Sequence, residues 1–381
     1  MTSALVSHMA SLFPDRPSTA PDFLLSRSTG SVLTQGSVET FTDPSAAVDA
    51  LKSSRVEMVV GALPFLPAGA GGAAAALTVP EVIRREATKL HPHQHYRGPA
   101  PSAHTVDTTP SADQHAALVA QAVDVLRSDA ALDKVVLARA VDYRFDSPTD
   151  PLLIAARLID GSLHGNGFIA DLSPAGGGML VGCSPEVLVR RHGRVVSAYP
   201  LAGSLPRSED SQEDLRRRDA LLSSAKDLAE HAFVVKSLRQ SLAPFCELSI
   251  PEKPEVTATR EMWHLATPIT GRLRDGSTTA LELAMAVHPT PAICGTPTSD
   301  AYEQIAHLEP FDRGFYAGAV GWCDSQGDGE YMVAIRCAEV APDCLSARAW
   351  AGGGIVAASS PDAEVAEAEA KLRTIGRALG V

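Results

Sequence analysis

DKVVLARAV, residues 133–141, is the stretch that decides how this chain folds. Its centre, residues 135–138 (VVLA), is an uninterrupted apolar run rich in β-branched side chains. A half-buried strand alternates apolar and polar residues, so a continuous run predicts a strand that is buried on both faces. Lys134 nevertheless opens the run, and an ammonium group that is buried without a partner is costly. Taken alone, Lys134 either caps the strand in solvent or is kept there for a function.

The overall composition is that of a globular protein and narrows the choice of partners. Of the 381 residues, 45% are hydrophobic and 20% are charged, as in ordinary folded chains. The formal net charge of −12 argues against nucleic acid or an anionic membrane surface as a partner. It does not exclude a small anionic ligand, because such a ligand responds to local charge and to any bound metal.

The six cysteines are scattered without CxxC spacing, and we expect them to be free thiols in a reducing compartment. The N-terminal residues contain no basic segment followed by a long apolar core, so no signal peptide is expected. No apolar run approaches the roughly 20 residues that a membrane-spanning helix needs. These features predict a cytoplasmic protein without a membrane partner.

From residue 110 onward the chain carries clear strand and helix patterns. Ser111 and Gln114 form a capping box that begins a helix leading into the 133–141 strand. Strand pairs interleaved with long helices indicate an α+β protein rather than a repeating βαβ array. Further strands are predicted at 166–171, 178–183, 186–190, 194–199, 316–322, 331–340 and 345–351, and helices at 211–224, 226–242, 278–287 and 362–379.

Two of these helices carry acidic pairs with the same spacing. Asp227 and Glu230 share one face of helix 226–242, and Glu364 and Glu367 share one face of helix 362–379, with Lys371 one turn further on. Two carboxylate pairs can surround a hard divalent cation such as Mg²⁺. The alternative is a pair of solvated faces, with an ordinary i,i+4 salt bridge between Glu367 and Lys371. The buried stripe of the first helix is predicted to be Leu228, Ala232, Val235, Leu238 and Leu242.

The segment AGGGIVAASSP, residues 351–361, is predicted to be a glycine-rich loop that enters the second of these helices. Ser360 and Pro361 suit the N-cap and first helical positions. Free backbone N–H groups at a helix N-terminus attract anions, and a carboxylate bridged by a cation fits the nearby acidic residues better than a phosphate. Alternatively, the glycines only allow close backbone packing.

Three further polar residues lie in or beside apolar strand patterns. Glu186, in GCSPEVLVRR (182–191), is either an exposed strand end or a carboxyl whose pKa is raised enough to act as an acid. Arg336, inside YMVAIRCAEV (331–340), needs a carboxylate from the protein or from a ligand if it is buried. His264 either packs as a satisfied core histidine or contributes to a site.

Nine sequence blocks, in consistent order from about residue 110 to the C-terminus, resemble those of the chorismate-binding enzymes. Within that superfamily the likeness is strongest to the isochorismate synthases of siderophore and menaquinone biosynthesis. Residues 1–109 resemble the family only loosely. The blocks are KVVLAR (134–139), GCSPEVLVRR (182–191), PLAGSLPR (200–207), SSAKDLAEH (223–231), MWHLATPITG (262–271), HPTPAICGTP (288–297), DRGFYAGAVGWCD (312–324), MVAIRCAEV (332–340) and GGGIVAASSPDAEVAEAEAKL (352–372).

The resemblance implies an α+β fold in which two large antiparallel β-sheets pack together with helices outside (α/β/β/α). It implies a single domain over residues 1–381, with the active-site core at 110–381 and a less typical part at 1–109. It also implies the Mg²⁺-dependent, reversible conversion of chorismate into isochorismate, with chorismate as the small-molecule partner.

Catalytic roles follow from the same resemblance. Lys134 corresponds to the general base that deprotonates the water attacking C2 of chorismate, and Glu186 to the general acid that protonates the hydroxyl leaving C4. Water is a weak nucleophile and hydroxide a poor leaving group, and each such proton transfer can contribute roughly 10²–10⁴-fold. On this interpretation Lys134 faces a water in the active-site cleft.

The metal and substrate positions are likewise implied by the resemblance. Glu230 and Glu367 correspond to Mg²⁺ ligands, and Asp227 and Glu364 to residues that hold metal-bound waters. Substrate-contacting positions are expected at Gly203, Ser204, His264, Ala292, Arg336, Gly352 and Lys371.

Related activities remain as alternatives. Salicylate synthases share the lysine base but also eliminate pyruvate, and they tend toward threonine near Ala292 and Ser204. Ala202 stands where one type of aminodeoxychorismate synthase has a lysine. No glutaminase domain is attached, so we expect no glutaminase subunit, and the family suggests a monomer. A catalytically silent ligand-binding protein on the same fold is a remote alternative, because Lys134, Glu186 and the metal carboxylates are all present.

Overall fold

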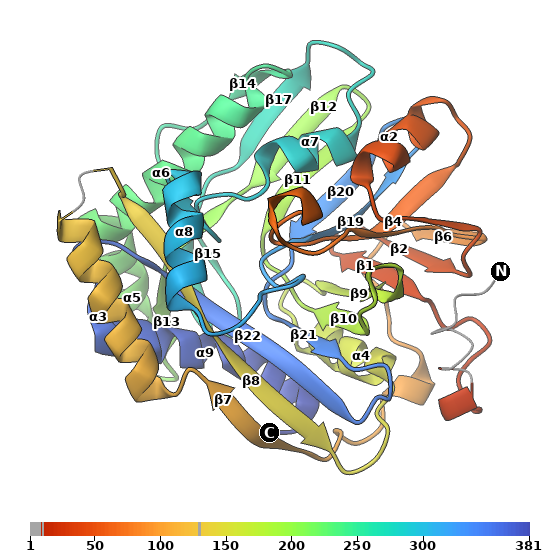
Figure 1. The fold of residues 1–381 in the computed structure, drawn as a ribbon, viewed down its shortest axis with the longest axis horizontal. Coiled ribbons are helices and arrows are strands. Elements are labelled where there is room, and N and C mark those ends of the chain that lie inside the picture. Colours follow the sequence, from red (N-terminus) through yellow and green to blue (C-terminus); the bar gives the residue numbers. More distant parts are fainter. Residues whose placement is uncertain (1–8, 10, 129–130) are drawn as a thin grey trace.

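Two large antiparallel β-sheets pack against each other in the computed structural model, which describes residues 9, 11–128 and 131–381 (Figure 1). The first sheet has ten strands, one of which, β7 (Ala103–Thr109), pairs with β8 beside the main path. Across the sheet, the other strands are β18 (Gly295–Thr296), β8 (Lys134–Phe145), β22 (Ser346–Ile355), β21 (Cys337–Val340), β10 (Met179–Gly182), β9 (Gly167–Asp171), β1 (Phe23–Arg27), β2 (Gly30–Gln35) and β6 (Val82–Glu86).

The second sheet has nine strands, and a small third sheet of three strands was not predicted from the sequence. The nine strands are, in order, β14 (Cys246–Ser249), β17 (Ile269–Leu273), β12 (Val195–Tyr199), β11 (Val187–His192), β20 (Gly329–Val333), β19 (Ala319–Asp324), β4 (Met58–Leu63), β5 (Ala76–Val79) and β3 (Glu39–Phe41). The third sheet consists of β13 (Leu201–Pro206), β16 (Met262–Ala266) and β15 (Glu255–Ala258).

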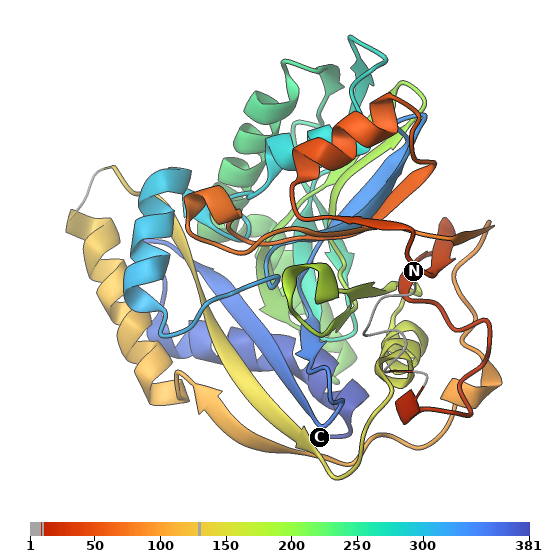
Figure 2. The same ribbon diagram turned by 45° about the vertical axis from the view of Figure 1, so that its right-hand side comes forward.

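Helices cover the outside of the sheets, as Figures 1 and 2 show. The described helices are α2 (Pro44–Lys52), α3 (Ala112–Ser128), α4 (Pro151–Gly161), α5 (Ser211–Ser223), α6 (Ala225–Leu242), α7 (Ala280–Val287), α8 (Thr298–Leu308) and α9 (Pro361–Leu379). Helices α3, α4 and α9 contact the first sheet, α2 and α7 the second, and α5 and α6 the third. The predicted α+β architecture with two large sheets is confirmed.

The main hydrophobic core lies between the two large sheets. It combines side chains of the first sheet, such as Leu137 and Phe168, with side chains of the second, such as Val189 and Val320, and all four are almost completely buried. Burial of this kind contributes roughly 1.5–3 kcal/mol for each large apolar side chain. A single core shared by both sheets fixes the strands that carry the functional residues.

Strand β8 is buried on both faces along residues 134–141, as its continuous apolar run predicts. It pairs along its length with β22, from Val135 opposite Ile355 to Arg144 opposite Ser346. The prediction of a glycine-rich loop at 351–361 is therefore wrong for its first half, because residues 351–355 are the last part of β22. The three glycines pack against β8: a Cβ on Gly352 would collide with the Leu137 carbonyl oxygen.

The predicted strand 331–340 is interrupted, because residues 334–336 separate β20 in the second sheet from β21 in the first. Arg336 has φ of 50°, in the left-handed region that side chains other than glycine adopt only rarely. The chain crosses between the sheets at this point, and periodicity within one segment cannot reveal such a crossing. Ser360 precedes α9 as predicted, but its side chain makes no capping hydrogen bond.

The buried face of α6 is also different from the predicted stripe. Leu238 and Leu242 are buried, but Leu228 and Val235 are only partly buried and Ala232 is exposed. The face that turns inward instead carries Asp227, Glu230, His231 and Val234. The buried polar side chains of α6 form hydrogen bonds and ion pairs with residues across the site, and these replace the bonds to water that burial removes. The polar face of α6 is therefore buried, while part of its predicted apolar stripe is not.

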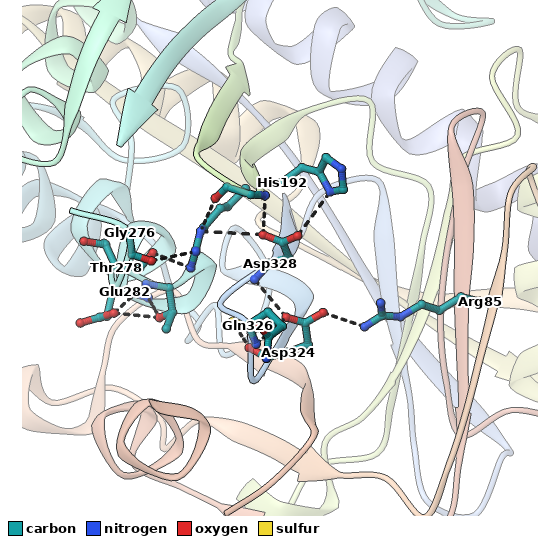
Figure 3. Close-up of polar contacts among 12 residues, drawn as sticks. Arg85, His192, Gly276, Thr278, Glu282, Asp324, Gln326 and Asp328 are labelled. Atoms are coloured by element: carbon teal, nitrogen blue, oxygen red, sulfur yellow. Dashed lines mark hydrogen bonds and ion pairs between the residues drawn. The ribbon is translucent and has the colours of Figure 1, made fainter. Parts of the chain in front are cut away.

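A polar network ties together the loops at one end of the second sheet (Figure 3). Buried Arg191 donates to the carbonyl oxygens of Gly193, Thr278 and Gly276, each at 2.9 Å. Asp328 accepts a hydrogen bond of 2.7 Å from the Gly193 backbone. These bonds join the β11–β12 and β19–β20 turns to the loop before α7.

Two simpler expectations concern cysteines and membranes. All six cysteines are free thiols, and five of them are buried. Among the helices in the described ranges, none has the length and apolarity needed to cross a membrane.

Candidate active site

A cavity of about 70 Å³ lies where β8, β22, β13, β16, α6 and α9 meet. Of the thirteen residues predicted from the sequence, Lys134, Asp227 and Glu364 do not line it. The other ten do: Glu186, Gly203, Ser204, Glu230, His264, Ala292, Arg336, Gly352, Glu367 and Lys371. Residues from segments far apart in the chain thus meet at one place.

Lys134 is fully buried, with 0% of its surface exposed. The short strand β18 pairs Thr296 with Lys134 and covers this end of β8. Lys134 Nζ donates a hydrogen bond of 2.9 Å to Glu230 Oε1. The solvent-capping alternative is therefore wrong, and Lys134 lies behind Glu230 rather than directly on the cavity.

Three of the predicted carboxylates on α6 and α9, Glu230, Glu364 and Glu367, are paired with lysines instead of facing solvent. Glu364 is 2% exposed and Glu230 7%, so the alternative of two solvated helix faces is wrong. The i,i+4 salt bridge within α9 is present but lies at the cavity. The three pairs are Lys134–Glu230 at 2.9 Å, Lys226–Glu364 at 2.9 Å and Lys371–Glu367 at 2.6 Å.

The carboxyl groups of this acidic cluster (Asp227, Glu230, Glu364 and Glu367) differ in their proton affinity. Burial raises the pKa of Asp227. Burial, followed by the nearby charge of Glu367, also raises the pKa of Glu364. Burial alone would raise the pKa of Glu367, but Lys371 and a 2.7 Å hydrogen bond from Ser204 Oγ outweigh it and lower the pKa. Glu367 is therefore held in its ionised form.

The glycines of β22 make room for these carboxylates. A Cβ on Gly353 would lie 2.8 Å from Glu364 Oε2 and 3.6 Å from Glu367 Oε1, and a Cβ on Gly354 would collide with Glu230 Oε1. The oxygen donors that converge here are those that Mg²⁺ prefers. Within the described ranges, no three acidic, histidine or cysteine side chains already form a closed metal-binding group. The donor chemistry fits a hard cation, provided that the carboxylates turn from their lysines toward it.

Glu186 is a buried acid on the cavity wall, immediately before β11. It is 3% exposed, and burial raises its pKa to about 8. A hydrogen bond from the Leu201 backbone and the charges of Lys134 and Lys371 offset this effect only in part. The predicted rise in pKa is confirmed, and the exposed strand-end alternative is wrong. At neutral pH the side chain is protonated and can donate its proton.

Arg336 brings an uncompensated positive charge to the cavity. It is 4% exposed, and its Nη1 has no hydrogen-bond partner in the part of the chain that the structure describes. Its Nη2 lies 3.4 Å from Nε2 of His264. Burial, then the charges of Arg336 and Lys371, lowers the pKa of His264 well below its usual value, so the imidazole is neutral. Arg336 is therefore free to bind a carboxylate of a ligand.

A buried ion pair behind the cavity was not predicted from the sequence. Arg313 bonds to Glu309 at 2.8 and 2.5 Å, and donates to the carbonyl oxygens of Ile293 and Val136 at 2.8 Å each. Glu309 Oε1 accepts from the Ala138 backbone at 2.7 Å. The pair fixes β8 against the segment that carries Ala292. Only the block DRGFYAGAVGWCD, which contains Arg313, pointed toward it.

The aromatic part of the cavity wall was also missed. Tyr316 and Trp350 line the cavity and stack with ring centroids 5.6 Å apart and an interplanar angle of 12°. Tyr316 lies in one of the quoted blocks, but Trp350 carries no signal of its own in the sequence. Together they add an aromatic part to the lining of the cavity.

Comparisons with known proteins agree with this site. The family model described as "Chorismate binding enzyme" matches residues 73–380. The isochorismate synthase DhbC of Bacillus subtilis is 46% identical over 331 residues, which cover 85% of this chain and 81% of that protein. The DhbC structure from Bacillus anthracis has a TM-score of 0.86 and 38% identity, covering 98% and 99% of the two chains.

A more distant solved structure shares the fold. The menaquinone-specific isochorismate synthase MenF of Escherichia coli has a TM-score of 0.81 and 24% identity, covering 99% of this chain and 91% of that one. The family match, the level of identity and the cavity lined by the quoted blocks lead to one conclusion. This chain belongs to the family of chorismate-binding enzymes.

Proposed function

We propose that this protein is an isochorismate synthase, which converts chorismate reversibly into isochorismate with Mg²⁺ as its cofactor. One observation carries the proposal: Glu186, with a pKa of about 8, shares a cavity with Arg336, whose Nη1 has no partner among the described residues. A buried acid suits a hydroxyl leaving group, and an unpaired guanidinium suits a carboxylate. The named relatives catalyse, by their names, this same reaction.

Two side chains would move protons in the reaction. A water attacks C2, the ring double bonds shift, and the C4 hydroxyl leaves as water after it receives the proton of Glu186. Lys134 takes the proton of the attacking water. Its Nζ donates to Glu230 in this structure, and it acts as a base in its neutral amine form, whose lone pair accepts the proton. Return of the proton to Glu186 completes the cycle.

Glu230 and Glu367 would hold Mg²⁺, with Asp227 and Glu364 supporting metal-bound waters. When bound, Mg²⁺ neutralises the ring carboxylate of the substrate among these acidic side chains. Ser204 and Lys371 both contact Glu367 and thereby orient it.

The remaining residues would bind and orient the substrate. Arg336, supported by neutral His264, would receive a carboxylate. Gly203 and Gly352 line the cavity and let its walls pack closely, because a Cβ on Gly203, whose φ is 78°, would lie 3.0 Å from Asp227 Cβ and a Cβ on Gly352 would collide with the Leu137 carbonyl oxygen. Ala292 is small and apolar, which favours release of isochorismate over pyruvate elimination.

The test is to incubate the purified protein with chorismate and Mg²⁺, with and without EDTA, and to separate the products by chromatography. An equilibrium mixture of chorismate and isochorismate, lost with EDTA and free of pyruvate, is expected. Salicylate with stoichiometric pyruvate would move the assignment to the salicylate synthases. No consumption of chorismate would contradict the proposal and favour a silent ligand-binding protein.

The role of Lys134 has its own test. Lys134→Met replaces the amine with an apolar side chain of similar length and should lose roughly 10²–10⁴-fold of kcat. The control is Lys52→Met, since Lys52 forms a partly exposed ion pair with Glu282. A Lys134→Met protein with the same kcat as the Lys52→Met control would contradict the base assignment.

We propose that the product feeds siderophore or menaquinone biosynthesis, since two similar solved structures are described as 2,3-dihydroxybenzoate-specific and menaquinone-specific isochorismate synthases. We further propose that the protein acts as a cytoplasmic monomer, without a glutaminase subunit. Sedimentation of the purified protein at a single-chain mass of 40.0 kDa would support the monomer.

A further inference from the structure

A second and larger cavity, of about 600 Å³, adjoins the candidate active site. Its walls come from residues 96–98, the end of α4 with the following loop, the turn between β15 and β16, and the C-terminal part of α9. Pro185 and Arg336 line both this cavity and the smaller one. These two residues therefore form the partition between the two spaces.

The lining of this second cavity is strongly basic although the whole protein is acidic. It contains five arginines and two acidic residues, a formal charge of +3, whereas the chain carries −12. One of the acids, Glu261, is already compensated, because it forms an ion pair with Arg377 and accepts a 3.0 Å hydrogen bond from Thr374. The arginines are Arg97, Arg157, Arg260, Arg336 and Arg377, and the second acid is Asp160.

The arginines occupy different depths. Arg97 and Arg260 are exposed at the mouth. Arg157 is half-buried and donates to the carbonyl oxygen of Ala378 at 3.1 Å, so part of its hydrogen-bonding capacity serves the fold. Arg336 lies at the inner end, almost fully buried, with Nη1 unpartnered among the described residues. Positive charge thus extends from solvent to the one guanidinium that both cavities share.

We propose that this cavity is the entry chamber through which a dicarboxylate substrate reaches the active site, and that Arg97 and Arg260 attract and hold it before Arg336 takes over one carboxylate. The inference rests on the proposed function, since it concerns how the same anionic substrate arrives. A protein of net charge −12 repels a dianion at long range, so a local basic mouth is needed to reverse the potential along the path. Arg97 and Arg260 act on binding and not on the chemical step.

The test compares substitutions that remove charge with substitutions that keep it. The double variant Arg97→Gln, Arg260→Gln should lose about tenfold of kcat/KM at an ionic strength of about 0.01 M, with kcat unchanged, because steering of this kind contributes roughly 10–10³-fold. At about 1 M salt, where charges are screened beyond about 3 Å, the loss should disappear. Mg²⁺ is kept constant and saturating throughout.

Three controls accompany the double variant. Arg97→Lys, Arg260→Lys keeps the charge and should keep both kcat/KM and its salt dependence. Asp160→Asn removes a negative charge from the same lining and should raise kcat/KM at low salt. Arg144→Gln removes an exposed arginine near the far end of β8, outside the cavity, and should change nothing.

The outcomes separate this proposal from the one on which it rests. If the wild-type protein does not convert chorismate, the proposed function fails. If it does, but the Gln double variant has the kcat/KM and the salt dependence of the wild type, the entry chamber is wrong. An equal loss in the Gln and the Lys double variants, or a loss that persists at high salt, also overturns it, because charge would not then be the cause.

Discussion

Glu186 illustrates at the scale of one residue how burial turns a carboxylate into an acid. Its side chain is 3% exposed and its pKa is raised to about 8, although two lysines lie near enough to lower it. Removal from water disfavours the charged form more than these partners favour it. The same side chain at an exposed strand end would be ionised at neutral pH and could not protonate a leaving group.

The first prediction concerns the pH dependence of the proposed reaction. The rate of isochorismate formation should fall as pH rises through about 8, because only protonated Glu186 can donate. Glu186→Gln should lose roughly 10²–10⁴-fold of kcat and show no such alkaline fall. A pH–rate profile of both proteins measures this. An alkaline limb that persists in Glu186→Gln would assign the titration to another group.

The second prediction uses the same residue to examine stability. In the unfolded chain Glu186 ionises near its ordinary pKa of 4.5, whereas in the folded protein it ionises near about 8. Its contribution to stability is therefore present below pH 4.5 and is lost as pH rises through about 8. As pH rises across this range, the thermal midpoint of the wild type should therefore fall relative to that of Glu186→Gln. A constant difference between the two midpoints would contradict the burial argument.

At the scale of elements, the pair Arg313–Glu309 joins the end of α8 to β8. Both side chains are 2% exposed, and between them they satisfy the backbone of Val136, Ala138 and Ile293. Val136 and Ala138 belong to the part of β8 next to Lys134, and Ile293 follows Ala292 directly. The pair thus positions two walls of the cavity without touching its space.

The third prediction follows from the cost of leaving one buried charge alone. Arg313→Leu should lower the free energy of unfolding by about 3–5 kcal/mol, because Glu309 stays buried without its partner. The control is Arg216→Leu on α5, where Arg216 pairs with Glu213 at the surface and a loss of only about 0.2–0.5 kcal/mol is expected. Urea unfolding of both variants provides the comparison. Equal losses would mean that the buried pair is not structural.

The fourth prediction concerns the glycines of β22. A Cβ on Gly354 would lie 2.6 Å from Lys134 Cε and would also collide with Glu230 Oε1, both near the ends of flexible side chains. Gly354→Ala should therefore shift these groups and cost about 10²-fold in activity, since a displacement of about 1 Å can do so, with little change in thermal midpoint. Gly276→Ala, where the added methyl meets open space, is the control. Full activity in Gly354→Ala would show that these groups need no fixed position.

At the scale of the whole molecule, the fold brings together the acidic faces of α6 and α9, which lie far apart in the sequence, as the ion pair between Lys226 of α6 and Glu364 of α9 shows. The four carboxylates have three lysine partners, so the cluster carries one excess negative charge. A divalent cation should stabilise such a cluster, because its attraction to the carboxylates is stronger than that of the lysine ammonium groups.

The fifth prediction examines the cation without relying on activity. Mg²⁺ that binds only the folded protein should increase the free energy of unfolding by about 2.7 kcal/mol at a hundredfold excess over its Kd. The thermal midpoint should rise accordingly. Glu367→Gln should abolish this rise, whereas Glu369→Gln, on the exposed side of α9, should keep it. A rise that survives in Glu367→Gln would remove this residue from the metal site.

Several elements could be predicted from the sequence because their causes are local. The two-sided burial of β8 follows from its continuous apolar run, and the helix that begins after Ser111 follows from its capping box, where Ser111 and Gln114 bond reciprocally. The quoted blocks brought ten of the thirteen predicted residues to one cavity. Local pattern failed at 331–340, where one apolar run serves two sheets, and on α6, whose polar face is the buried one.

The sequence by itself determined the order and type of the main elements, the family, and the residues that gather at the site. Only the tertiary structure decided that Lys134 is fully buried against Glu230, that Arg313 and Glu309 fix β8 from behind, and that arginines from five separate segments line one cavity. The physical reason is the separation along the chain over which each effect acts. Periodicity and capping act between residues a few positions apart, whereas the energy of a buried charge depends on which distant segment supplies its partner.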